Sequence, residues 1–333
     1  MRIVYLGSGQ FGLPCLDAIV SSGHKIALVV SQPAQPAGRG RKSTPTPVAG
    51  WAAEHSVPVI EAVDVNSSEM VDRLGKCKPD LIVVIAFGQK ISAEVAAVAA
   101  KGAINVHASL LPKYRGAAPI NWAIVDGVTE TGVTIITIAE KMDAGEILAS
   151  MKTMLDLEET AGELHDRLAK LAAPLLMTTI DQIAAGTAIY RKQDESKVTR
   201  APKLKKSDGF LDFAEPAEVL HRKMLGFWPW PGATAVYRSK KSGRTERVTF
   251  ARAEILRTAN PENLPPGTID EDLNVVCGKN RLQIVQLKPE NSRLMTFADF
   301  VNGRRISPGD RFVKIADSTL RQGSVQASSP QED

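Results

Sequence analysis

A run of apolar residues at positions 81–86, Leu-Ile-Val-Val-Ile-Ala, most constrains how this chain can fold. A strand without any polar residue suits a position that is buried on both faces of a sheet. Such a sheet needs a cover on each side, and in parallel sheets the helices that connect the strands supply it. The run therefore favours an α/β domain.

The segments on either side of this run alternate between strand and helix patterns. We expect strands at residues 3–6, 25–31, 57–60, 81–86, near 104 and at 132–138, and helices at 13–22, 48–55, 67–74, 93–100 and 160–184. The repeated strand–helix order predicts a doubly wound, mostly parallel sheet of the Rossmann-like type. A ligand of such a sheet lies at the carboxyl ends of its strands.

The first strand runs into a glycine turn at residues 7–12, Gly-Ser-Gly-Gln-Phe-Gly, which fits the dinucleotide fingerprint G-x-G-x-x-G. One interpretation is therefore a nicotinamide-dependent oxidoreductase. However, the second strand ends in Ser31 and Gln32, where that fingerprint needs an acidic residue for a ribose hydroxyl. The other interpretation is that the glycines only bring strand and helix together.

A second domain is expected, because 333 residues exceed the usual size of one domain. Short strands separated by turns are predicted at 235–237, 248–255, 267–269, 273–277 and 282–287. This spacing favours a small β-barrel of the oligonucleotide-binding (OB-like) type. We divide the chain into a catalytic domain at 1–187, a basic linker at 188–206, the barrel at 207–313 and a tail at 314–333, whose polar composition predicts disorder.

Charge is distributed unevenly between these parts. Residues 1–187 carry 16 Lys/Arg and 19 Asp/Glu, whereas residues 188–314 carry 24 and 15, a net charge of +9. This excess either binds a polyanion or only keeps the protein in solution. The candidate contacts to a nucleic acid are Arg39, Arg41, Lys42, Lys203, Lys205 and Lys206.

The first three of these cations belong to a long loop at residues 32–47. Its four prolines and two glycines exclude a helix or a central strand. Loops of this length without secondary structure are usually functional or disordered. The loop is either an arm that becomes ordered on a nucleic acid or a solvated insertion.

Polar side chains follow two of the predicted strands. Asn105 and His107 alternate with apolar residues, so both point to the same face of the strand near residue 104. Asp143 follows the strand at 132–138, next to two small residues. Taken singly, these are a strand cap and an ordinary turn aspartate. Together, an amide donor, an imidazole and a carboxylate can stabilise an oxyanion and transfer a proton.

The cysteines and histidines point to no metal site. Cys15, Cys77 and Cys277 lie far apart and fit neither a metal spacing nor a disulfide framework. This cysteine usage suggests a cytoplasmic protein. No stretch approaches the apolar length of a membrane span. We predict no protein partner and therefore a monomer.

Ordered motifs along the chain resemble the formyltransferases that use 10-formyltetrahydrofolate. They are residues 105–112 (Asn-Val-His-Ala-Ser-Leu-Leu-Pro), 114–120 (Tyr-Arg-Gly-Ala-Ala-Pro-Ile), 130–135 (Glu-Thr-Gly-Val-Thr-Ile) and 143–145 (Asp-Ala-Gly). The loop at 36–40 (Pro-Ala-Gly-Arg-Gly) is similar to that of the branch of the family that acts on methionyl-tRNA. The chain departs from this branch at Ala34-Gln35, where an Asp-Arg pair is usual, and so lacks one cation of the arm.

The resemblance implies transfer of a formyl group from 10-formyltetrahydrofolate to the α-amine of initiator methionyl-tRNA. The catalytic residues that it implies are Asn105, His107 and Asp143. The folate contacts that it implies are Ser109, Leu110, Leu111 and Pro112. How the three catalytic residues divide their roles stays open. The alternatives are a formyltransferase for a small amine and an RNA-binding module without catalysis.

Overall fold

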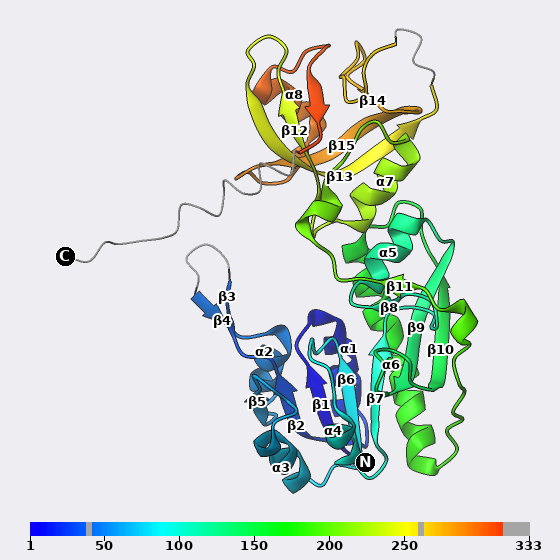
Figure 1. Cartoon of the computed structure of the whole chain (residues 1–333). Helices are drawn as coiled ribbons and strands as arrows, with labels where there is room; N and C mark the ends of the chain where they lie inside the picture. Colours follow the sequence, from blue (N-terminus) through cyan, green and yellow to red (C-terminus); the bar gives the residue numbers. More distant parts are fainter. Residues whose placement is uncertain (38–41, 259–262, 316–333) are drawn as a thin grey trace, which may run out of the picture. The chain divides into compact units, whose positions relative to one another are not determined.

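The computed structural model describes residues 1–37, 42–258 and 263–315. The chain forms two compact units (Figure 1). The first comprises Met1–Ala123, Val128–Leu157 and Glu163–Lys203, and the second comprises Ile124–Gly127, Glu158–Gly162 and the chain from Leu204 onward. Arg39 and Arg41 lie outside the described residues, as does the tail beyond residue 315 that the sequence predicts to be disordered.

A seven-stranded sheet forms the centre of the first unit, in the order β10-β9-β7-β6-β1-β2-β5. Its strands are β1 (Arg2–Gly7), β2 (Lys25–Ser31), β5 (Val59–Glu61), β6 (Leu81–Ile85), β7 (Ala103–His107), β9 (Glu130–Thr137) and β10 (Ile147–Met154). The first five of these run parallel, whereas β9 is antiparallel to both β7 and β10. The strand order reverses direction between β1 and β6, and a sheet of this type binds its ligand at that point.

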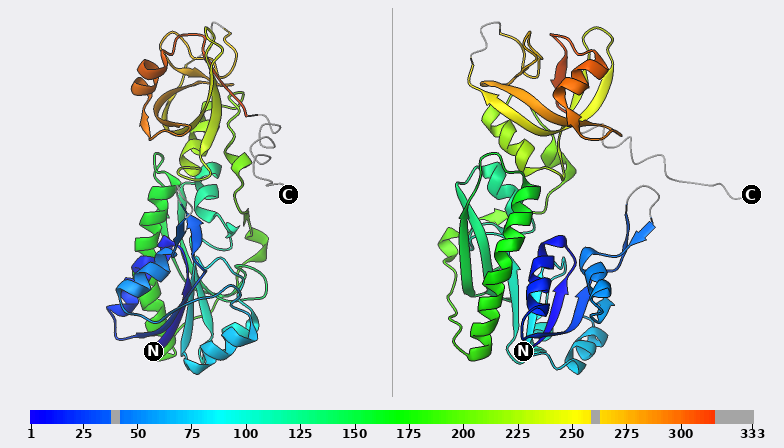
Figure 2. Two further views of the ribbon diagram at one scale, coloured as in Figure 1. Left: turned by 90° about the vertical axis from the view of Figure 1, so that its left-hand side faces the viewer. Right: turned by 180° about the vertical axis from the view of Figure 1, so that it is seen from behind.

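Helices cover both faces of this sheet (Figure 2). They are η1 (Gln10–Gly12), α1 (Leu13–Val20), α2 (Pro47–Glu54), α3 (Ser68–Lys76), α4 (Ala93–Ala97) and α6 (Ala161–Ala185), and α5 (Pro119–Asp126) follows the loop after β7. Met70 of α3 and Val95 of α4 share a core with Val4 and Leu6 of β1. Every residue of β6 is buried, as its apolar sequence predicts. Among the helices in the described part of the chain, none is both long and apolar enough to cross a membrane.

The 32–47 segment contains a hairpin where the sequence predicts a loop without secondary structure. Strands β3 (Gln35–Ala37) and β4 (Lys42–Thr44) pair antiparallel with each other and form a sheet of their own (Figure 1). Pro36 is tolerated there because each strand of a two-stranded sheet is an edge strand. The prediction was therefore wrong for these strands, although it excluded a central strand correctly.

An antiparallel sheet forms the second unit, in the order β14-β15-β13-β12-β17, with β16 beside β15. Its strands are β12 (Ala233–Arg238), β13 (Thr245–Leu256), β14 (Val275–Val276), β15 (Arg281–Pro289), β16 (Met295–Thr296) and β17 (Arg311–Val313), and its helices are η3 (Lys206–Gly209), α7 (Ala217–Gly226) and α8 (Phe297–Arg304). Leu220 and Met224 of α7 and Phe300 of α8 are buried in one core with the strands.

Residues 267–269 nearly close this sheet into a barrel. The N–H of Gly267 donates to the carbonyl of Val276 in β14 at 2.7 Å, and the carbonyl of Gly267 accepts from Phe312 in β17 at 2.8 Å. The segment, which the sequence predicts as a strand, thus bridges the two outer strands. The expected fold class, a doubly wound, mostly parallel domain followed by a small β-barrel, is confirmed.

Candidate active site

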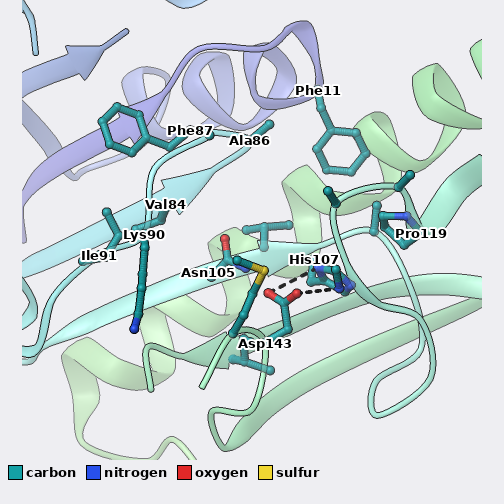
Figure 3. Close-up of a pocket in the computed structure, with 18 of the residues that line it drawn as sticks. Phe11, Val84, Ala86, Phe87, Lys90, Ile91, Asn105, His107, Pro119 and Asp143 are labelled. Atoms are coloured by element: carbon teal, nitrogen blue, oxygen red, sulfur yellow. Dashed lines mark hydrogen bonds and ion pairs between the residues drawn. The ribbon is translucent and has the colours of Figure 1, made fainter. Parts of the chain in front are cut away.

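A cavity of about 560 Å³ lies in the first unit, where β1, β6 and β7 end (Figure 3). Much of its wall is apolar and includes Phe11, Val84, Phe87 and Ile91. Such a cavity, with mostly apolar walls and a few convergent polar groups, is typical of a small-molecule site. It also lies beside the reversal of strand order between β1 and β6, as this sheet type predicts.

The structure brings the three predicted catalytic residues together at this cavity. Asn105 and His107 come from β7, and Asp143 comes from the turn between β9 and β10 (Figure 3). His107 Nδ1 lies 3.7 Å from Asp143 Oδ1, and both side chains are nearly buried. The Asn105 side chain forms no hydrogen bond within the described residues, so its N–H donors are available to a ligand.

A backbone carbonyl determines the tautomer of His107. The ring Nε2 lies 2.9 Å from the carbonyl oxygen of Tyr114, which can only accept, so Nε2 carries a proton. In the neutral ring Nδ1 is therefore an acceptor, and it faces the carboxylate of Asp143. Two acceptors that face each other provide a place for one proton between them.

Three residues at the site have a left-handed backbone. Ala86, Tyr114 and Asp143 have φ values of 46°, 60° and 55°. This conformation is unfavourable for residues other than glycine and is often found at functional sites. Two of the three belong directly to the predicted catalytic arrangement, because the carbonyl of Tyr114 accepts from His107 and Asp143 is part of it.

The glycine turn after β1 is explained by packing. A Cβ atom at Gly12 would lie 1.9 Å from the hydroxyl of Tyr5. The N–H groups of Ser8 and Gly9 donate to the carbonyl of Ala86 at 3.3 and 3.4 Å. They are therefore not free to bind a pyrophosphate, which argues against the oxidoreductase interpretation.

Comparison with known proteins assigns the family. Residues 1–180 match "Formyl transferase", and residues 203–305 match "Formyl transferase, C-terminal domain". The methionyl-tRNA formyltransferases of Citrifermentans bemidjiense and Halorhodospira halophila are 36% and 40% identical to 93% of this chain, over 95% and 98% of their own lengths. The chain belongs to the methionyl-tRNA formyltransferase family. The resemblance drawn from its sequence is confirmed.

A solved structure supports the same fold. WlaRD, a sugar 3N-formyl transferase solved in the presence of dTDP and 5-N-formyl-THF, matches with a TM-score of 0.61 at 15% identity. The match covers 88% of this chain and 99% of WlaRD. At this identity the likeness concerns the fold alone. The enzyme class thus comes from the formyltransferase relatives and the cavity residues.

The four residues predicted to contact folate in this formyltransferase do not line the cavity: Ser109, Leu110, Leu111 and Pro112. The Ser109 hydroxyl donates to the carbonyl of Lys113 at 2.7 Å, and the Leu111 N–H donates to the hydroxyl of Thr134 at 3.1 Å. Folate contact by these residues stays a prediction. The sequence reasoning missed residues 88–91, which line the cavity directly after β6. Their place beyond a strand end was the available signal.

Residues 191–201, which we call the strap, are hydrogen-bonded to two strands of the first unit. Arg191 exchanges two backbone hydrogen bonds with Ile147 of β10, at 2.7 and 2.9 Å. Strand β11 (Arg200–Ala201) pairs with β8 (Arg115–Gly116), which follows the loop after β7. Although the sequence places the strap in a linker, its residues belong to the first compact unit.

Arg115 carries a buried charge that pairs with two residues of the strap. Its side chain is 3% exposed and lies 2.6 Å from the carboxylate of Glu195. Arg115 Nε and Nη2 also donate to Gln193 Oε1 at 3.1 and 2.8 Å. The hydrogen bond from Arg115 lowers the pKa of the Glu195 carboxyl. A buried arginine needs such partners, because an unpaired buried charge is strongly destabilising.

The structure describes the side chains of three of the predicted RNA contacts. Lys203, Lys205 and Lys206 are exposed, and none forms an ion pair with another described residue. Lys203 ends the first unit, whereas the other two lie in the second unit, at and before the start of η3. In the described residues, no group of three or more His, Cys, Asp or Glu side chains is placed to hold a metal ion.

Proposed function

We propose that this chain transfers a formyl group from 10-formyltetrahydrofolate to the α-amine of initiator methionyl-tRNA, giving the N-formylmethionyl-tRNA used to start translation. The observation that carries the proposal is the meeting of Asn105, His107 and Asp143 in one cavity of a chain from this family. We further propose that the enzyme works in the cytoplasm, as its cysteine usage suggests. We also propose that it is a monomer, because all three residues come from one chain.

Asn105 stabilises the oxyanion. Attack of the amine on the formyl carbon gives a tetrahedral intermediate whose oxygen becomes negatively charged. The Asn105 amide has N–H donors without a partner in the described protein, and it lines the cavity. A donor already in place at the developing charge lowers the barrier without reorganisation.

Asp143 and His107 accept and transfer the proton that the amine loses. The Asp143 carboxylate accepts it, directly or through a water molecule, and shares it with His107 Nδ1 at 3.7 Å. The proton then passes to the folate nitrogen as the bond between that nitrogen and the formyl carbon breaks. Because Nε2 of His107 already donates to Tyr114, Nδ1 is the nitrogen available for this exchange.

The cavity suits the flat pteridine ring of the folate. Phe11, Phe87 and Ile91 provide apolar surface against which a flat ring can pack. Its volume of about 560 Å³ is within the usual range for small-molecule sites. Residues 88–91 would thus take over much of the folate binding that the sequence assigns to 109–112.

The rest of the chain binds the tRNA. In our proposal, residues 1–187 carry out the chemistry, the linker at 188–206 provides Lys203, Lys205 and Lys206, and the barrel at 207–313 binds the phosphates of the tRNA. The net charge of +9 over residues 188–314 supports this division. Arg39, Arg41 and Lys42 of the 32–47 segment add a second group of cations.

A formylation assay tests the proposal. Purified protein is given 10-formyltetrahydrofolate with charged initiator or elongator methionyl-tRNA, and both tetrahydrofolate and formylmethionyl-tRNA are measured. We expect both products with the initiator tRNA and far less with the elongator. No release of tetrahydrofolate would overturn the proposal. Faster formylation of a small amine, such as an amino sugar nucleotide, would favour the alternative substrate class.

A further inference from the structure

We propose that Gln193 is a positioning residue for catalysis, which sets the place of the Asp143 carboxylate beside His107. This inference rests on the proposed function. The side chain of Gln193 lies in the strap and forms no hydrogen bond with Asn105 or His107 within the described residues, so it would act through Asp143 alone.

The turn that carries Asp143 needs support from outside. Asp143 has a positive φ of 55°, which is unfavourable for an aspartate unless its surroundings fix it. In the described part of the chain, one hydrogen bond supports the Asp143 side chain: Oδ2 accepts from the N–H of Gly116 at 2.8 Å. Oδ1 remains directed towards His107. A shift of the turn would therefore change the distance between carboxylate and imidazole.

Gln193 supplies the support for the main chain of this turn. Its Nε2 donates to the carbonyl of Asp143 at 2.8 Å and to the carbonyl of Gly145 at 2.7 Å. Both N–H groups of the amide are thus used on two carbonyls of a single turn. Asp143 is consequently held at its side chain by Gly116 and at its main chain by Gln193.

Arg115 fixes Gln193 in turn. Its guanidinium donates to Gln193 Oε1 at 3.1 and 2.8 Å, so the amide cannot rotate without losing these bonds. The neighbours of Arg115 complete the arrangement, since Tyr114 holds His107 and Gly116 holds Asp143. Residues 114–116 and Gln193 therefore fix both members of the proton-sharing pair. Small displacements of such groups are expected to lower the rate strongly.

The Gln193 side chain accepts hydrogen bonds from Arg115 and donates them to the turn of Asp143, and the variant Gln193→Glu separates these two functions. It keeps the length and an acceptor for Arg115, but it replaces the two N–H donors by an oxygen that repels the carbonyls of Asp143 and Gly145. We expect kcat to fall about 10- to 100-fold, with both KM values within about threefold. Asp194→Asn is the matched control, because Asp194 is adjacent and its side chain bonds, among the described residues, only to Ser196 and Lys197. It should retain activity within about twofold.

A double-mutant cycle shows whether Gln193 acts through Asp143. In the Asp143→Asn background, Gln193→Glu should lower the rate by less than about twofold further. Losses that multiply would overturn the proposal, as would wild-type kcat in Gln193→Glu alone. If Gln193→Glu does not fold, Gln193→Asn makes the same test, because it keeps the amide but is one carbon too short to reach both partners.

A measurement without substrate separates this proposal from the proposed function. Nitrogen NMR of the ligand-free protein reports the environment of His107 Nδ1. We expect its resonance to shift in Gln193→Glu and to stay in place in Asp194→Asn. An unchanged resonance in Gln193→Glu would overturn the positioning role. Failure of the wild type to formylate methionyl-tRNA, with the resonance shifted as expected, would overturn only the proposed function.

Discussion

Asn105 differs from the other two proposed catalytic residues in its hydrogen bonds. His107 and Asp143 are each held by a backbone group of residues 114–116. The Asn105 amide has no such bond within the described residues. Its capacity for hydrogen bonding is therefore directed to whatever occupies the cavity. This makes Asn105 the residue whose loss should affect the transition state most selectively.

Replacing Asn105 by alanine should lower kcat about 10²- to 10³-fold, because one donor to the oxyanion is lost. KM for both substrates should change little, since the donor matters most once the charge has developed. Steady-state kinetics of formylation provide the measurement. Asn105→Asp is the matched variant, and it should be at least as impaired, because it brings a negative charge to the oxyanion. Full activity of either variant would contradict the role.

Cys15 should make the stability of the protein fall at alkaline pH. Burial raises the pKa of the Cys15 thiol from 9.0 to about 12. Above pH 9 the unfolded state therefore loses a proton that the folded state keeps, so the free energy of unfolding falls as the pH rises from 9 towards 12. The slope is about 1.4 kcal/mol per pH unit for one thiol.

Urea unfolding at about pH 8 and about pH 10 measures this effect. Cys15→Ala should lose about 1 kcal/mol less than the wild type between these values, although its stability at the lower pH is reduced by the missing side chain. The Cys15→Ala variant should still lose some stability between these pH values, since burial also raises the pKa of Cys277 to about 12. Equal losses in wild type and variant would contradict the assignment.

At the residue scale, the sequence predicted which polar residues lie together at the ends of the strands. Asn105 and His107 follow from alternation along one strand, and Asp143 follows from the end of another. The contact of Arg115 with Gln193 could not be found in this way. The two residues are 78 positions apart and lie in short or irregular segments, where no periodicity relates them. Nothing in the sequence separates a buried arginine from an exposed one.

At the element scale, strands and helices with a strong hydrophobic pattern were predicted correctly, and those with a weak pattern were missed. Strand β2 (Lys25–Ser31) has the predicted bounds, and α6 (Ala161–Ala185) differs by one residue at each end. Strand β10 was missed, since its inner face is only partly buried and its outer face carries residues such as Met154. Helix α7 was also missed. Its sequence begins with a proline at the N-cap and carries three charged residues, which obscure the apolar face.

The turn between β1 and α1 depends on the pairing of a glycine with a tyrosine. Gly12→Ala should destabilise the first unit, because the added Cβ would lie 1.9 Å from the Tyr5 hydroxyl. Overpacking of this kind typically costs about 1–3 kcal/mol. Tyr5→Phe removes the clashing oxygen and should recover part of the loss in the double variant. Thermal unfolding of the four proteins gives the coupling, and simple additivity would exclude the contact as the cause.

The whole molecule combines a near-neutral part, which we propose to be catalytic, with a basic remainder. Residues 1–187 have a net charge of −3 and residues 188–314 a net charge of +9. The chemistry and the proposed phosphate contacts are thereby separated along the chain. The 32–47 segment is the exception, because it places three cations within the first unit's part of the sequence. Charge alone predicted this division, whereas no charge count could give the hairpin that β3 and β4 form.

Neutralising the cations of this segment tests its part in binding tRNA. In the triple variant Arg39→Gln, Arg41→Gln, Lys42→Gln, KM for methionyl-tRNA should rise at least about tenfold, while KM for the folate stays unchanged. If all three cations contact phosphates, the slope of log affinity against log salt should become shallower by about 3. Filter binding at several salt concentrations measures it. An unchanged slope would show that the segment is a solvated insertion.

The carbonyl of Ala86 has a consequence for how the proposed folate pocket forms. It accepts hydrogen bonds from Ser8 and Gly9, and the next carbonyl, of Phe87, accepts one from the Gln32 side chain at 2.9 Å. These bonds join the loop after β6 to the segments after β1 and β2 without any ligand. A folate that binds there, as we propose, therefore loses little affinity to ordering this wall. Amide hydrogens of Ser8 and Gly9 should accordingly exchange slowly with solvent in the free enzyme.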